Sequence, residues 1–176
     1  PGTFKTYLWI YWLQSAVIGI FTFFNILTVN KMVAGSLISN GEPVTDKNIS
    51  KGCISFFFLF HYEGFHFVYA IFLFVFSFEN AGNFDFNFFK IAALGIFANQ
   101  IIWYVQNKFR QKERSVNLGK VFFLPYLRII PMHLILLIPA FFNIPYMGLF
   151  LILKTLMDVI LHLITTEWYW KKEESI

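Results

Sequence analysis

The chain alternates long apolar segments with shorter polar ones. Five segments are close to the roughly 20 apolar residues with which an α-helix crosses a bilayer core of about 30 Å. These predicted spans cover about residues 5–29, 52–78, 88–105, 121–142 and 146–167. The pattern predicts an all-α fold, a polytopic helical membrane bundle with five transmembrane helices in a single transmembrane domain that covers residues 1–176.

Composition supports the membrane class and narrows the chemistry. The chain is 57% hydrophobic and 14% charged, whereas a soluble domain is about 25% charged. We therefore expect the lipid bilayer as the main partner, with a homo-oligomer as an open alternative. The single cysteine, Cys53, excludes an intrachain disulfide and a cysteine-based metal site. Because the chain begins at Pro1 rather than Met, we expect an upstream segment.

Basic residues are distributed unequally between the two sides of the predicted bundle. The polar stretches 30–51 and 106–120 and the C-terminal tail together hold ten Lys and Arg residues, whereas the opposite side has only Lys5 and Lys90. Cytoplasmic loops of membrane proteins are enriched in Lys and Arg. The pattern predicts cytoplasmic loops, a cytoplasmic C-terminus and a multi-pass protein of the cell membrane. The net charge of +4 is therefore explained by the basic cytoplasmic loops, and we expect no nucleic-acid partner.

The last predicted span carries three ionisable residues on one helical face. Lys154, Asp158 and His162 are spaced at i, i+4 and i+8. Ionisable groups within a membrane face protein or water rather than lipid, because exposure to lipid is costly. The other spans are therefore expected to supply partners for this face.

Polar residues of several spans fall at similar predicted depths. At 1.5 Å per helical residue, Arg128 lies roughly 10 Å from the cytoplasmic face, His61 and Asp158 about 13 Å, and Glu63 about 16 Å. His162 lies nearer that face, and His133 is closer to the midplane. The similar depths predict one shared polar pocket that opens toward the cytoplasm.

A divalent metal site, most simply zinc, is the first hypothesis for this pocket. Asp158 and His162 lie one helical turn apart, and imidazole and carboxylate groups are typical zinc ligands. We predict that the metal ligands are His61, His133, Asp158 and His162. The predicted catalytic residues are Glu63, as general base on a metal-bound water, and Arg128.

Additional polar residues would support these ligands, and the pocket suggests a substrate class. Asn99, Gln100 or Tyr62 would orient the ligands through hydrogen bonds. A membrane-delivered substrate with a hydrolysable bond fits an intramembrane pocket. No compact motif such as His-Glu-x-x-His is present. Glu63 and His66 have the Glu-x-x-His spacing of di-iron bundles, but no second such pair exists, so a di-metal centre is not expected.

Two other functions are open. Acidic residues and histidines inside spans also mark proton pathways, so a proton-coupled transporter or channel is the second hypothesis. Pro131 and Pro139 would bend the fourth span around a cavity. The third hypothesis is a purely structural polar core, in which Arg128 pairs with Asp158 and Glu63 with Lys154.

The chain also resembles a known family through a set of short motifs. They are His61-Tyr62, Pro125-Tyr126-Leu127-Arg128-Ile129 with His133, Lys154-Thr155 with Asp158 and His162, and Tyr11-Trp12 followed by Phe24-Asn25-Ile26-Leu27. It is similar to small prokaryotic integral-membrane proteins known only as a domain of unknown function. The resemblance covers about Tyr11–His162 and implies a membrane fold with a polar centre, without assigning a reaction.

The chain departs from the family pattern at several positions. Gln14 stands where an acidic residue is usual, and Glu63 interrupts the expected His-Tyr-Gly. His66 takes the place of a second histidine later in that helix, and the family's additional first span is missing.

Overall fold

The computed structural model describes residues 3–29, 38–39, 42–43, 51–79, 83–111 and 116–130, and the isolated positions 134, 152, 155–156, 158–160 and 162–163. The chain divides into two compact units, Pro1–Phe122 and Phe123–Ile176. The first contains three long helices, and the second contains Arg128 and the described residues that follow it.

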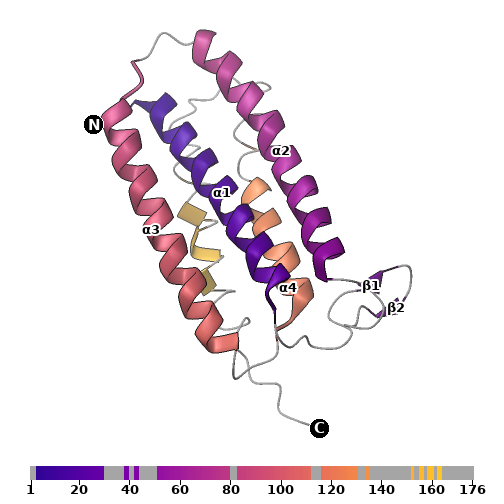
Figure 1. Cartoon of the computed structure of the whole chain (residues 1–176). Helices are drawn as coiled ribbons and strands as arrows, with labels where there is room; N and C mark the ends of the chain where they lie inside the picture. The colour runs from indigo at the N-terminus through magenta and orange to yellow at the C-terminus, as the bar shows by residue number, and fades with distance from the viewer. Residues whose placement is uncertain are drawn as a thin grey trace. The chain divides into compact units, whose positions relative to one another are not determined.

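Three long helices form the first unit. They are α1 (Phe4–Leu27), α2 (Lys51–Glu79) and α3 (Phe86–Gln111), and each is long and apolar enough to cross a membrane. α1 packs against both α2 and α3 and lies between them (Figure 1). Helices are therefore present where the first three spans were predicted, and α3 extends further at its C-terminal end than the sequence indicated. The five-span count stays a prediction, because most of 131–176 lies outside the described residues.

Hydrogen bonds at the helix ends show how the three helices alternate in direction. The Lys5 ammonium near the start of α1 donates to the Ser77 carbonyl near the end of α2, at 2.6 Å. At the opposite end, Lys51 at the start of α2 donates to the carbonyl of Val29, just after α1, at 2.9 Å. α2 therefore runs antiparallel to α1, whereas α3 runs parallel to α1 (Figure 1).

Small residues of α1 allow α2 to approach closely. Gly19 of α1 is buried, and a methyl group at this position would overlap the Tyr62 ring and the Glu63 carboxylate of α2. Ser15, one turn earlier, is also buried. Small residues spaced by four are typical of close helix contacts in membranes, where packing rather than the hydrophobic effect holds helices together. This contact brings the polar residues of α2 against α1.

The outward surfaces of α2 and α3 are strongly apolar. Large exposed side chains on α3 include Ile91, Leu94, Ile101 and Phe109, and on α2 Phe60 and Phe67. A soluble protein rarely exposes so many large apolar side chains in continuous patches. This surface fits contact with lipid tails.

The predicted loop 30–51 contains local structure that the apolar pattern did not indicate. In the predicted loop 30–51, Ile38–Ser39 (β1) pairs antiparallel with Glu42–Pro43 (β2). The intervening sequence is Asn40-Gly41, the dipeptide typical of two-residue hairpins.

The start of the predicted fourth span is not one uninterrupted α-helix. α4 (Leu118–Phe123) begins after Asn117, whose side-chain oxygen accepts the Lys120 N–H at 3.0 Å. It is followed by a 3₁₀ helix, η1 (Leu124–Arg128), with Pro125 in its first turn. Proline lacks the N–H that an α-helix interior needs, which explains the change of helix type.

Candidate functional site

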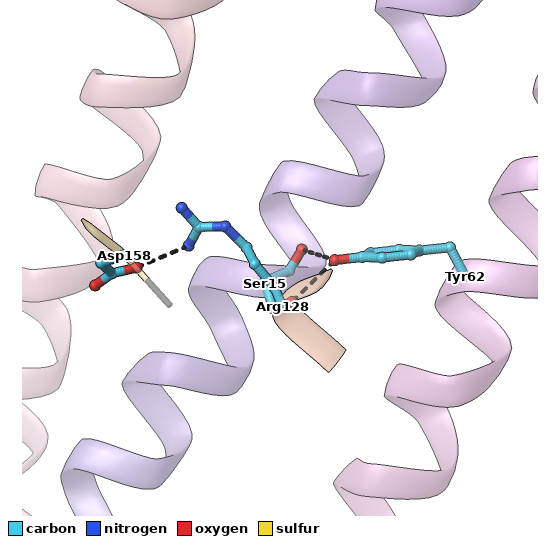
Figure 2. Close-up of polar contacts among 4 residues, drawn as sticks. All are labelled: Ser15, Tyr62, Arg128 and Asp158. Carbon is cyan, nitrogen blue, oxygen red and sulfur yellow. Dashed lines mark hydrogen bonds and ion pairs between the residues drawn. The ribbon is translucent and has the colours of Figure 1, made fainter. Parts of the chain in front are cut away.

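The α1–α2 contact buries a group of polar side chains, the α1–α2 cluster, which consists of Ser15, Tyr62, Glu63 and His66. Tyr62 is fully buried and its hydroxyl lies 2.9 Å from the Ser15 hydroxyl (Figure 2). The same hydroxyl donates to the Ser15 carbonyl at 3.4 Å. The Tyr62–Ser15 bonds therefore fix the α1–α2 contact at the level where Glu63 and His66 follow on α2.

His66 has a defined tautomer and one free lone pair. Its side chain is 1% exposed, and Nδ1 lies 3.0 Å from the Tyr62 carbonyl oxygen one turn earlier. Because a carbonyl only accepts hydrogen bonds, Nδ1 carries the proton and the neutral ring has its lone pair on Nε2. Nε2 is buried and has no hydrogen-bond partner. His66 therefore presents an unused proton or metal acceptor inside the protein.

Glu63 adds a second unused acceptor nearby on the same helix. Its Oε1 atom is buried without a hydrogen-bond partner and faces Gly19 of α1. Glu63 and His66 are three residues apart, so they lie on neighbouring positions of one helical face. Buried polar atoms in proteins are nearly always paired, and exceptions invite a functional explanation.

A second polar group, the α1–α3 cluster, lies at the other side of α1. It consists of Asn25, Thr28, Tyr104, Asn107, Lys108 and Gln111. Gln111 donates through Nε2 to Asn25 Oδ1, and Lys108 donates to the Thr28 carbonyl and to Gln111 Oε1, both at 3.0 Å. This cluster consists of amides, hydroxyls and one ammonium. It differs from the α1–α2 cluster in having no carboxylate and no imidazole.

The second unit contains one of the predicted residue pairs. Arg128 Nη1 lies 3.7 Å from Asp158 Oδ1 (Figure 2), and the Asp158 side chain is 40% exposed. This is the ion pair anticipated by the structural hypothesis. A separation of 3.7 Å is an ionic contact rather than a hydrogen bond.

The predicted metal ligands have different surroundings. His61 is exposed on α2, with its ring beside Phe57 and Phe65. His162 is exposed in the second unit, and His133 lies outside the described residues. Among the residues that the structure describes, no three His, Cys, Asp or Glu side chains gather closely enough to hold a metal ion.

The joint pocket and its zinc ion therefore stay predictions. Glu63 lies in the first unit and Arg128 in the second. Of the two predicted supporting amides, Gln100 is buried and Asn99 is exposed on α3.

The main feature that sequence reasoning missed is the role of α1. No candidate site residue was predicted in its span. In the structure, Ser15 hydrogen-bonds to Tyr62 of α2, Asn25 hydrogen-bonds to Gln111 of α3, and Gly19 lies directly against Tyr62 and Glu63. The spacing of Ser15 and Gly19 was the available indication, since small residues four apart mark close helix contacts.

Comparisons with known proteins give a family but no function. No curated protein matches this chain. No solved structure matches it either. A family model does match over almost the whole chain and confirms the resemblance to proteins of unknown function. The chain belongs to the family of unknown function DUF6498, whose model matches residues 3–175.

Proposed function

We propose that this protein moves protons across a membrane and that Glu63 and His66 form its proton-binding centre. One observation carries the proposal: Oε1 of Glu63 and Nε2 of His66 are both buried and unpartnered, three residues apart on α2. Carboxylates and imidazoles inside membrane spans are typical of proton relays. The same helix is apolar and long enough to cross a bilayer.

The chemistry of the two acceptors suits reversible proton binding. An ionised side chain at the membrane centre costs about 3 kcal/mol on the insertion scale, so a buried carboxylate without a partner is stabilised by taking up a proton. The neutral His66 ring can accept a proton on Nε2, since Nδ1 already donates to the Tyr62 carbonyl. A proton therefore binds to Glu63 Oε1 or to His66 Nε2, and no other bond is formed or broken. It is released when water reaches the centre.

Proton flux into vesicles tests the transport step. Purified protein is reconstituted with a trapped pH-sensitive dye, and a potassium gradient with valinomycin imposes a membrane potential. We expect the wild type to acidify the vesicle interior and Glu63→Gln to remove most of that flux. Asp85→Asn is the matched control, because Asp85 caps α3 through its side-chain oxygen and asparagine is an equally good cap.

Infrared spectroscopy tests the binding step without requiring transport. A protonated carboxyl group in the apolar interior gives a C=O band that disappears when the group ionises. We expect a titrating band of this kind in the wild type and its loss in Glu63→Gln. Absence of the band in the wild type, or its persistence in the variant, would contradict the assignment of Glu63.

A metal-dependent hydrolase is a second candidate, supported by the His66 geometry. Metal-ligating histidines commonly donate the other ring N–H to a backbone carbonyl, as His66 does to Tyr62. Elemental analysis separates the possibilities. Zinc near one equivalent that is lost in His162→Ala would support the predicted ligands His61, His133, Asp158 and His162. Zinc lost in His66→Gln but retained in His162→Ala would place the metal at the α1–α2 cluster, with Glu63 as the neighbouring carboxylate.

A further inference from the structure

An asparagine with an exposed side chain lies at the centre of α3. The helix runs from Phe86 to Gln111, and Asn99 is close to its midpoint. At 1.5 Å per residue, Asn99 is about 18–20 Å from either end of the helix, which places it near the middle of a hydrocarbon core of about 30 Å. Lipid tails offer no hydrogen bonds, so an amide exposed at this depth is costly unless another protein group pairs with it.

The Asn99 amide points away from the helix that α3 packs against. Gln100, Asn107 and Gln111 are buried, and Gln111 hydrogen-bonds to Asn25 of α1. Among the described residues, none forms a hydrogen bond with the Asn99 side chain. The contact with α1 therefore satisfies one side of α3 and leaves this central amide for a different partner.

Three other exposed residues share the direction of Asn99. Gly95, Asn99, Ile102 and Gln106 follow one another at i, i+4, i+7 and i+11, so they form one stripe along α3, which we call the Asn99 face. The Asn99 face combines an apolar side chain, a glycine and two amides, and it has no charged residue. Small residues, alanine included, let helices approach closely in membranes, and amides hydrogen-bond across the contact.

The symmetry of a membrane dimer favours an identical copy as the partner. The uneven distribution of basic residues predicts one orientation for all copies in the membrane. A two-fold axis along the membrane normal would then bring two α3 helices together in parallel, with each residue at the axis facing its own counterpart. An amide carries both donors and an acceptor, so two asparagines can satisfy each other, whereas two like charges would repel.

We propose that the Asn99 face binds the same face of a second copy of this chain, with the two Asn99 amides hydrogen-bonded to each other across the axis. The absence of charge on the Asn99 face and its self-complementary amides support this partner. The charged residues Arg128 and Asp158 of the second unit pair with each other.

Energy transfer in lipid vesicles tests the dimer. The single cysteine, Cys53, is exposed and takes a donor or an acceptor dye. We expect transfer between copies that falls as lipid dilutes the protein, and Asn99→Leu should raise the dissociation constant roughly tenfold through loss of the amide pair. Asn99→Gln keeps an amide and should retain most of the association. Asn87→Leu is the matched control, because Asn87 is exposed in the first turn of α3, away from the membrane centre.

Cysteine cross-linking tests which side of α3 forms the contact. In a Cys53→Ser background, oxidation should link two copies through Ile102→Cys or Gln106→Cys. Leu94→Cys and Ile101→Cys are the controls, because both positions are equally exposed on α3 but point in other directions.

Several results would overturn the proposal. Equal cross-linking at all four positions would indicate random collisions rather than a defined face. Equal association of Asn99→Leu, Asn87→Leu and the wild type would show that the amide does not hold two copies together. A wild type that is monomeric at all dilutions, with Asn99→Leu less stable to unfolding, would assign Asn99 to a contact within one chain. Circular dichroism verifies the helical fold of each variant.

Discussion

The two polar clusters on either side of α1 differ in how completely their groups are paired. In the α1–α3 cluster, the Gln111 side chain is hydrogen-bonded through both its nitrogen and its oxygen. In the α1–α2 cluster, Tyr62 and Ser15 are paired, but Glu63 Oε1 and His66 Nε2 are buried without partners. Both clusters use the same central helix, so the difference lies in the residues that α2 and α3 contribute.

The contrast distinguishes side chains that hold helices together from side chains that are available for chemistry. Amides satisfy each other, because each carries both donors and acceptors, and such pairs hold helices together inside a membrane. A carboxylate oxygen and an imidazole lone pair are both acceptors and cannot satisfy each other without a shared proton or cation. The α1–α3 contact is therefore largely complete by itself, apart from Asn107 and Lys108 at its end. The α1–α2 contact leaves two buried acceptor atoms, which fits the proposal that it binds a proton or an ion.

The largest effect is expected where α1 and α2 are closest. In Gly19→Ala, the added methyl group meets the buried Tyr62 ring and the Glu63 carboxylate, so we expect a loss of about 1–3 kcal/mol in the free energy of unfolding, the usual cost of overpacking. Unfolding in mixed detergent micelles measures it. Gly95→Ala is the control, because nothing lies within 4 Å of a methyl group there. A helix-interior alanine should stabilise that position by about 0.5–1 kcal/mol. Equal effects at both glycines would show that α1 and α2 are not in close contact.

A smaller effect is expected from the amide pair of the α1–α3 cluster. Asn25→Leu or Gln111→Leu alone should lower the free energy of unfolding by about 1–2 kcal/mol, because the remaining amide is left buried without its partner. The double variant should lose less than the sum of the two single losses. A double-mutant cycle gives the coupling, expected near 0.6 kcal/mol. Strict additivity would mean that the two amides do not interact.

The smallest effect is expected from single hydroxyl groups. Tyr62→Phe removes both contacts of the hydroxyl group with Ser15 and should cost about 0.6 kcal/mol, the average for polar contacts between membrane helices. Tyr104→Phe is the matched change in the other cluster. It should cost less, because the Tyr104–Thr28 contact is longer, at 3.3 Å, and exposed. If Tyr104→Phe proved the more costly change, the view that the tighter polar contact lies between α1 and α2 would be wrong.

Much of the fold was predictable from the sequence, whereas the candidate site was predictable only in part. The first three spans follow from uninterrupted apolar segments, and the structure places helices there with boundaries shifted by a few residues. Glu63 was singled out because a carboxylate in an apolar span is conspicuous, and in the structure its Oε1 atom is buried. His66 was noted for its spacing from Glu63 but was not assigned to the centre. His61 was preferred, although its ring lies exposed beside two phenylalanines.

The sequence by itself determined that this is a chain of long apolar helices with ionisable groups inside them, because helix length and hydrophobicity are local properties. Only the tertiary structure decided which of those groups are enclosed. His61 and His66 are five residues apart, so their directions around the helix axis differ by about 140°, and the position of α1 makes one buried and the other exposed. The ionisable groups of α2 are buried because Gly19 and Ser15 are small enough for α2 to pack closely against α1. This contact joins residues more than 40 positions apart in the chain.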